Sequence, residues 1–415
     1  MTFLRMPHQD EQKKRYAQLI IRFGLNLQKG QNLIIRASIE SHDFVQLIAK
    51  EAYQAGVKEI FYWRESDELK LLKYQMAPKE TIGKYPQWIA DGYTEVLKNN
   101  CATLYLDDHD PELFKNINPE LLQKEQLAVW EARKERIKLV SSYEVNRLIV
   151  AVAQLGRAKM LYPKSTDEEA MQQLRNQIFQ LVRLDQEDPI QARKTHLKKL
   201  NAAADFLNTQ HFKALHYEGK GTKLRVELPD QHRWMGAGEK TKSGIEFCPN
   251  MPTEEVFTAP HSKGVEGELS FTRPLLYAGQ RIEEAKLTFR AGEVVAYTAK
   301  KGEELLGKLL ASDPNAKRLG EVAIVPINSP VYQSGLVFAS TLLDENASCH
   351  FAFGKAYPST FLGAEKLSSE AKAEAGFNES MIHVDFMVGD ESLSITGETS
   401  DGSFIPFFVK GKWNF

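Results

Sequence analysis

The chain has 415 residues, of which 42% are hydrophobic and 26% are charged. This composition is typical of a folded globular protein and argues against wholesale disorder. Lys and Arg total 53 while Asp and Glu total 55, giving a formal net charge of −2, which excludes a nucleic-acid binder that depends on a strongly basic molecule.

The few cysteines and the short apolar runs bear on where in the cell the protein is found. Cys101, Cys248 and Cys349 are too few and too scattered for a disulfide framework. Residues 1–16 are rich in charge and lack the apolar stretch of a signal peptide. The longest apolar run, residues 148–153, is far too short to cross a bilayer. We therefore expect a cytoplasmic protein with neither a membrane nor a nucleic acid as partner.

The first half of the chain alternates short apolar runs with helical periodicity. The apolar runs predict three strands, at residues 32–37, 57–63 and 101–106. Since helical patterns separate them, this rhythm predicts a parallel sheet covered by helices. Two charged amphipathic helices are predicted next, at residues 166–184 and 188–207. We expect residues 1–210 to form an N-terminal α/β domain.

Three acidic residues, Asp107, Asp108 and Asp110, follow the third predicted strand. The carboxyl end of a parallel strand is a common place for ligands, but we favour a solvated loop that caps the next helix. No G-x-G-x-x-G motif follows any of these strands, which argues against a dinucleotide-binding domain.

Beyond residue 210 the pattern changes to short alternating strands. A hairpin signal surrounds EGKG at residues 218–221, and a helical pattern covers residues 303–311. Strands are predicted at residues 212–217, 222–228, 268–272, 282–290, 294–300, 321–325, 382–388 and 392–396. We expect residues 211–415 to form a β-rich α+β domain that carries a catalytic metal site.

The segment MIHVDFMVG, residues 381–389, is the clearest candidate for chemistry. In a strand the side chains alternate between the two faces, so His383 and Asp385 share one face while Val384 and Phe386 share the other. An imidazole and a carboxylate placed in this way can both reach one metal ion. A satisfied His–Asp pair in a core is the alternative that the segment alone leaves open.

Three further segments hold polar residues without an evident structural role, at residues 250–260, 320–325 and 344–357. In the first, Glu254 and Glu255 point opposite ways in an extended chain, so at most one of them lines a given site. With the MIHVDF strand, the segments supply four carboxylates and two imidazoles as candidate ligands: Glu255, Glu321, Glu345, His350, His383 and Asp385.

A ligand set of this kind can hold two divalent ions, and its hard-to-borderline atoms suit zinc, cobalt or manganese. Two ions in one site clamp and activate an attacking water. The phenol of Tyr357, in the third of these segments, could donate a hydrogen bond to a developing oxyanion. The residues therefore favour a two-metal hydrolase.

In their order and spacing these four segments resemble the M29 family of metallo-aminopeptidases, and the resemblance covers the whole chain. It implies an exopeptidase with two metal ions per chain, zinc or cobalt supporting activity, that acts on peptides with a free N-terminus and forms a homodimer. Carried over by motif, it implies the same six ligands and makes Tyr357 the active-site tyrosine. Glu321 is our candidate for the group that carries a proton to the leaving amine.

Two other functions stay open at this point. One is a two-metal hydrolase of another amide or ester. The other is a non-enzymatic small-molecule-binding protein that uses the α/β half, with the acids of the second half serving structure only. Which of Glu254 and Glu255 is the ligand is also undecided from the sequence.

Overall fold

The computed structural model describes residues 9–415. Residues 1–8, half of the segment interpreted as lacking a signal peptide, lie outside this range. The described chain forms two compact units. The first, the parallel-sheet unit, contains residues 9–195 and 238–252, and the second, the antiparallel unit, contains residues 196–237 and 253–415. The domain boundary that the sequence places at residue 210 stays a prediction.

The parallel-sheet unit is built on one five-stranded sheet with the order β2-β1-β3-β4-β9, in which every neighbouring pair is parallel. Its strands are β1 (Asn32–Ser38), β2 (Ile60–Glu65), β3 (Cys101–Asp107), β4 (Arg147–Ala151) and β9 (Asn250–Met251). A separate two-stranded ribbon consists of β7 (Glu239–Lys240) and β8 (Glu246–Phe247). The α/β domain expected from the sequence is confirmed.

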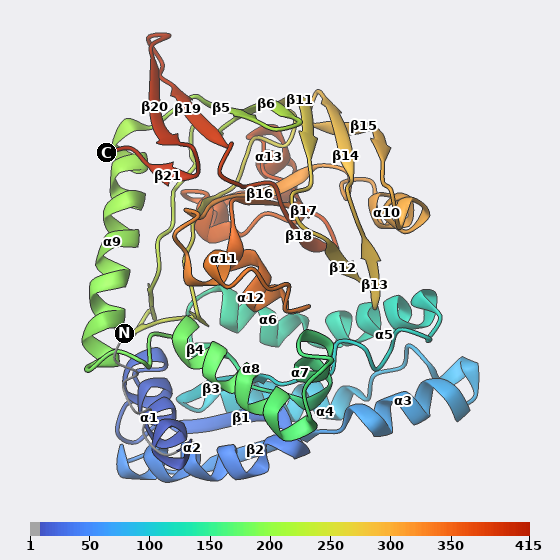
Figure 1. The fold of residues 1–415 in the computed structure, drawn as a ribbon, viewed down its shortest axis with the longest axis vertical. Helices are drawn as coiled ribbons and strands as arrows, with labels where there is room; N and C mark the ends of the chain where they lie inside the picture. The colour runs from blue at the N-terminus through green and yellow to red at the C-terminus, as the bar shows by residue number, and fades with distance from the viewer. Residues whose placement is uncertain (1–8) are drawn as a thin grey trace. The chain divides into compact units, whose positions relative to one another are not determined.

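Helices connect the strands of this sheet, and Figure 1 shows them in blue to green. They are α1 (Gln9–Leu19), α2 (His42–Gln54), α3 (Asp67–Met76), α4 (Gln87–Lys98), α5 (Pro119–Ala132), α6 (Lys134–Ser141), α7 (Leu155–Leu161) and α8 (Asp167–Leu181), with the short helices η1 (Ile20–Gly24), η2 (Ile39–Ser41) and η3 (Lys79–Thr81). The helix α9 (Pro189–Gln210) runs from this unit into the next. Helical cover on a parallel sheet explains why β1 and β3 are mostly buried and why apolar residues predominate in them.

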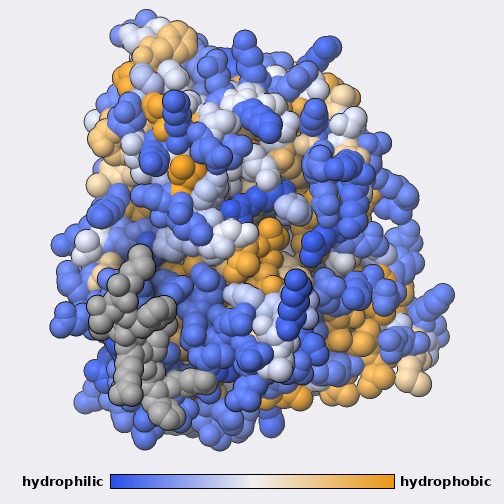
Figure 2. Space-filling view, viewed as in Figure 1, coloured by the Kyte–Doolittle hydropathy of each residue, from blue (hydrophilic) through white to orange (hydrophobic). Residues whose placement is uncertain are grey.

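The sequence predicted three of the five strands. The apolar run that was too short for a membrane span forms β4, and β9 has only two residues and therefore no periodicity to detect. No helix among residues 9–415 is both long and apolar enough to span a membrane. On the face drawn in Figure 2 most of the surface is hydrophilic, interrupted by separate apolar patches.

The expectation of a solvated acidic loop after β3 is wrong for Asp108. Its side chain is only 2% exposed, and its two carboxylate oxygens accept the backbone N–H of Ser38 at 3.2 and 2.9 Å. The strand order reverses between β1 and β3, where doubly wound proteins usually bind ligands. Asp108 ties the two strand ends together there, which weakens the small-molecule-binding alternative.

Substituting Asp108 by Asn tests this buried carboxyl. Burial raises the pKa of Asp108 to about 6, so holding it ionised at neutral pH costs about 3 kcal/mol. Because its pKa is higher in the folded than in the unfolded chain, the stability of the wild-type protein falls as the pH rises through about 4 to 6. We expect Asp108→Asn to raise the melting temperature at pH 8 and to raise it less at pH 5. Thermal melting measures both differences. If Asp108→Asn changed the melting temperature by the same amount at pH 5 and pH 8, the raised pKa of Asp108 would be contradicted.

The antiparallel unit contains two larger sheets. The eight-stranded sheet has the order β15-β14-β11-β6-β5-β19-β20-β21, and the four-stranded sheet has the order β10-β16-β17-β18. The strands of the first are β5 (Ala214–Gly219), β6 (Thr222–Glu227), β11 (Val265–Ser270), β14 (Lys286–Arg290), β15 (Glu293–Thr298), β19 (Ser394–Glu398), β20 (Phe404–Val409) and β21 (Lys412–Trp413). Those of the second are β10 (Val256–Thr258), β16 (Leu319–Ile324), β17 (His350–Gly354) and β18 (His383–Met387).

Smaller elements complete this unit, which is drawn in green to red in Figure 1. They are the hairpin β12 (Leu275–Tyr277) and β13 (Gln280–Ile282), the helices α10 (Glu303–Leu310), α11 (Pro330–Ser334), α12 (Thr341–Asp344) and α13 (Ser369–Glu374), and the short helices η4 (Glu345–Ala347), η5 (Pro358–Thr360) and η6 (Ala364–Lys366). The expected β-rich domain is thus confirmed.

One apolar core joins the two larger sheets. From the four-stranded sheet, Phe351, Phe353 and Phe386 enter it, with ring centroids of Phe353 and Phe386 4.3 Å apart. From the eight-stranded sheet, Tyr217 packs against Phe351 with the two rings tilted and their centroids 5.1 Å apart. Because side chains alternate along each strand, this core turns the neighbouring residues of β16, β17 and β18 to the opposite face.

Candidate metal centre

The face of the four-stranded sheet that turns away from the core carries the candidate ligands. Strand register pairs Glu321 of β16 with Ala352 of β17, and pairs Ala352 in turn with Asp385 of β18. His350 pairs with Ala323, and His383 pairs with Gly354. Each long polar side chain therefore lies beside a residue with a small side chain or none. This leaves room for the polar ends to converge above the sheet.

A β-bulge at the start of β16 sets the position of Glu321. The pairing of β16 with β17 shifts between Leu319 and Glu321, which leaves Gly320 without a partner in the ladder. A Cβ atom on Gly320 would lie 2.3 Å from the carbonyl oxygen of Gly354 and 2.5 Å from that of Lys355. Only glycine permits this close backbone approach, and bulges of this kind commonly re-aim a side chain beside an active site.

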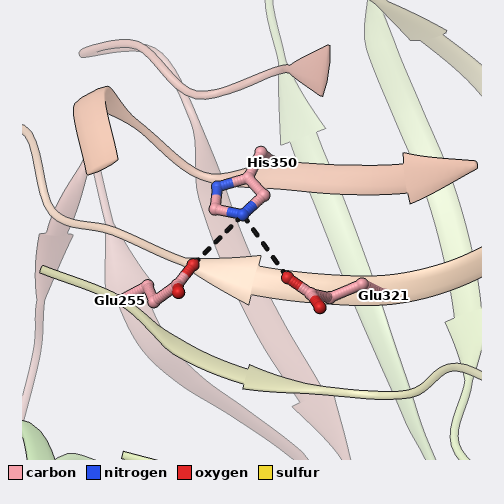
Figure 3. Close-up of side chains that lie close together, drawn as sticks. All are labelled: Glu255, Glu321 and His350. Carbon is pink, nitrogen blue, oxygen red and sulfur yellow. Dashed lines mark ion pairs between the residues drawn. The ribbon is translucent and has the colours of Figure 1, made fainter. Parts of the chain in front are cut away.

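The polar groups form two triads that share Glu321. In the first, Nε2 of His350 lies 3.2 Å from Oε2 of Glu255 and 3.5 Å from Oε1 of Glu321, and Figure 3 shows both carboxylates pointing at this nitrogen. In the second, Nε2 of His383 lies 3.7 Å from Oε2 of Glu321 and 3.3 Å from Oδ1 of Asp385. Within each triad the ligand atoms all lie within 4.8 Å of one another.

Backbone carbonyl groups orient both imidazoles. Nδ1 of His350 lies 3.1 Å from the carbonyl oxygen of Ser348, and Nδ1 of His383 lies 2.7 Å from that of Lys355. A carbonyl oxygen can only accept, so each Nδ1 carries the hydrogen and each neutral ring presents the lone pair of Nε2 to the carboxylates. This is the arrangement in which a protein presents a histidine to a metal ion.

The residues fit a cation because buried polar atoms here lack any other partner. Within residues 9–415, Oε2 of Glu255, Nε2 of His350 and Oδ1 of Asp385 are buried and make no hydrogen bond of acceptable geometry. A lone pair that faces carboxylate oxygens without a proton or cation between them is repulsive. Buried, unpaired polar groups are costly, and a divalent cation would satisfy all three.

The electrostatics of the cluster indicate the same need. Burial, together with the nearby carboxylates of Glu255 and Asp385, raises the pKa of Glu321 above its ordinary value. Burial lowers the pKa of His383, but Asp385 and Glu321 outweigh it and raise the pKa to about 9. Burial likewise lowers the pKa of His350, yet the adjacent carboxylates of Glu255 and Glu321 raise it well above its ordinary value. In the absence of an ion, the cluster would therefore attract protons.

Glu345 and Tyr357 complete the predicted set from outside the sheet. Glu345 opens η4, and burial together with the charges of Glu255 and Asp385 raises its pKa well above the ordinary value. It therefore lies close to the triads without belonging to either. Tyr357 precedes η5, is 41% exposed, and places its ring centroid 4.6 Å from that of His383.

The two adjacent glutamates, which the sequence alone could not distinguish, have different neighbours in the structure. The carboxylate of Glu255 lies beside His350, while Oε2 of Glu254 lies 3.3 Å from Nε2 of His196. Sequence analysis missed His196, which comes from α9, as well as the carbonyl groups that orient the two candidate histidines. A backbone carbonyl has no sequence signal, because every residue carries one.

A family model described as thermophilic metalloprotease (M29) matches residues 9–413. The chain belongs to the M29 family. It is 42% identical to aminopeptidase AmpS of Bacillus subtilis (strain 168), over 96% of this chain and 98% of that protein. It is 40% identical to aminopeptidase T of Thermus thermophilus, again over 96% of this chain and 98% of that protein. The solved structure of wild-type AmpT from Thermus thermophilus matches with a TM-score of 0.93 at 38% identity, covering 98% of this chain and all of that one.

This M29 chain is accordingly an enzyme, a metal-dependent aminopeptidase. The family resemblance read from the sequence is confirmed, and so is the combination of an α/β part with a β-rich part. The M29 family also implies the use of divalent metal, for which the two triads are suitable groups.

Proposed function

We propose that the protein is a two-metal aminopeptidase that releases the N-terminal residue from peptides with a free N-terminus. The observation that carries this proposal is the pair of His–carboxylate triads sharing Glu321. The two oxygens of Glu321 face two different imidazoles, so Glu321 could serve as a ligand in each triad, whereas a site for a single ion would need only one triad.

Six residues would hold the ions: Glu255, Glu321, Glu345, His350, His383 and Asp385. Their four carboxylates carry four negative charges when ionised, which two divalent cations would balance. The mixture of carboxylate and imidazole ligands suits zinc, cobalt or manganese. When bound, a pair of such ions supplies Lewis acidity and a water that is acidic enough to react near neutral pH.

The chain's own residues would position the substrate and move its protons. Glu321 lies between the two imidazoles, so its carboxylate can take a proton from the attacking water and pass it to the leaving amine. The half-exposed phenol of Tyr357 can donate a hydrogen bond to the oxygen of the scissile carbonyl as charge develops there. An acid of the cluster would hold the substrate's α-amine and so restrict cleavage to the first residue.

Two further features of the proposal rest on the sequence. A homodimer follows from the family resemblance. A cytoplasmic location follows from the cysteine usage, and Cys101, Cys248 and Cys349 are all free and buried.

Metal-free protein should be tested on an aminoacyl nitroanilide before and after addition of cobalt or zinc. We expect no hydrolysis before addition and restored hydrolysis afterwards, because the proposal assigns to the ions the Lewis acidity that makes the attacking water reactive near neutral pH. An aminopeptidase should reject the same substrate with a blocked amine. Equal hydrolysis of free and blocked substrates would instead favour a two-metal hydrolase of other amides or esters, and binding of fewer than two ions per chain would contradict the two-metal proposal.

A further inference from the structure

The six proposed ligands differ in how the fold holds them. Glu321, His350, His383 and Asp385 lie on β16, β17 and β18, where ladder hydrogen bonds fix the backbone. Glu255 and Glu345 do not. Glu255 precedes β10, and Glu345 lies in the short helix η4. Some other interaction must therefore fix these two side chains relative to each other.

The side chain of Asn346 joins the two segments that lack a ladder. It is completely buried. Its Oδ1 accepts the backbone N–H of Glu254 at 2.6 Å, directly before Glu255. Its Nδ2 donates to the carbonyl oxygen of Leu342 at 2.9 Å, and lies 3.5 Å from Oε1 of Glu345. One amide group thus reaches the backbone beside one proposed ligand and the carboxylate of the other.

Neighbouring hydrogen bonds fix this amide in place. Oγ of Ser329, itself buried, donates to the carbonyl oxygen of Asn346 at 2.6 Å. On the other side, Nε2 of His196 lies 2.8 Å from the carbonyl oxygen of Thr253. The peptide group between Thr253 and Glu254 is therefore held at both its carbonyl and its N–H ends. All of these hydrogen bonds join protein groups, so they can fix the segment before an ion binds.

We propose that Asn346 is a positioning residue that sets Glu255 and Glu345 at the spacing required for metal binding. The inference rests on the proposed two-metal function and deepens it. Residues that orient metal ligands typically change metal affinity by about 10–100-fold when they are removed. Asn346 acts on two ligands at once, so its loss should weaken metal binding while leaving the strand-borne ligands in place.

The test compares Asn346→Ala with the matched control Asn146→Ala. Asn146 is also completely buried, donates through Nδ2 to Leu25 at 2.9 Å and accepts through Oδ1 from Gln31 at 2.9 Å, but it lies in the parallel-sheet unit. Calorimetric titration of each metal-free variant with zinc measures the affinity, and thermal melting without metal measures stability. We expect both variants to melt at lower temperature, whereas only Asn346→Ala binds zinc about 10–100-fold more weakly.

Excess metal gives a second readout that separates positioning from mere structural damage. We expect Asn346→Ala to recover much of its kcat at saturating metal, because its catalytic groups remain. Unchanged zinc affinity in Asn346→Ala would overturn the inference, as would an equal loss of affinity in Asn146→Ala. Failure of the wild-type protein itself to bind two ions would count against the proposed function and not specifically against Asn346.

A measurement on wild-type protein keeps the inference testable if Asn346→Ala does not fold. Hydrogen exchange of the Glu254 amide should be slow in the metal-free protein, since Asn346 accepts its N–H before any ion binds. The opposite result would be a Glu254 amide that exchanges as fast as an open loop in the metal-free protein and becomes protected only after zinc is added. That result would show that the ion, and not Asn346, orders the segment.

Discussion

Replacing Glu321 by Gln should lower kcat by about 10²–10⁴-fold, the range typical of a lost general acid–base group. Gln has nearly the same shape but cannot accept a proton, and its amide is a poor ligand for an ion. Because Glu321 lies between both imidazoles, the substitution affects both triads at once. No other residue of the cluster belongs to both.

The same substitution should raise the melting temperature of the metal-free protein. Glu321 is buried, and burial together with the charges of Glu255 and Asp385 raises its pKa. Removing one negative charge relieves that repulsion, so the folded state gains stability. Loss of turnover combined with a gain in stability distinguishes a functional carboxylate from a structural one, whose removal would lower both.

Steady-state kinetics with saturating metal and thermal melting without metal measure the two effects. Glu254→Gln is the matched control, since Glu254 is buried to a similar extent, is a member of neither triad and has its carboxylate beside His196. We expect its kcat to stay close to the wild-type value. A near-normal kcat in Glu321→Gln would contradict the proposal that Glu321 transfers the proton. An equally large decrease of kcat in Glu254→Gln would contradict it as well.

Replacing Tyr357 by Phe should lower kcat by roughly 10²-fold with little change in KM. A hydrogen bond to a developing oxyanion strengthens in the transition state, so its loss appears mainly in kcat. The ring remains to pack at 4.6 Å from His383, and the side chain is partly exposed, so we expect no loss of stability.

Tyr297→Phe is a suitable comparison, because Tyr297 on β15 is 40% exposed and Tyr357 is 41% exposed. Both kinetic constants of Tyr297→Phe should match those of the wild type. An effect of Tyr357→Phe confined to KM would assign the phenol to ground-state substrate binding instead.

The alternation of side chains along a strand made much of the site predictable. The pattern MIHVDF placed His383 and Asp385 on one face, and the structure has Phe386 in the core and the two polar residues on the opposite face. The prediction depended only on local geometry, which the sequence encodes directly. Similarly, the apolar runs within β1 and β3 are strong signals, because strands covered on both faces are rich in apolar residues.

Features that depend on distant partners could not be predicted. The choice between Glu254 and Glu255 depends on His196 and His350, which lie far away in sequence. Asp108 looked like a solvated acid because the N–H that it accepts belongs to Ser38 on another strand. Asn346 had no signal either, since a buried asparagine is recognisable only once its hydrogen-bond partners are in place.

The order of the strands in the four-stranded sheet has a consequence for how the protein is made. Its strands β10, β16, β17 and β18 have the same order in the sheet as along the chain, with β11 to β15 inserted between the first two, and the proposed ligands extend from Glu255 to Asp385. A ribosome must therefore synthesise most of the polypeptide before the last pair of ligands emerges. If these residues hold the metal, its capture would come late in biogenesis, after the N-terminal sheet has had time to fold, and a nascent chain that stops before His383 would lack two of the three residues of the second triad.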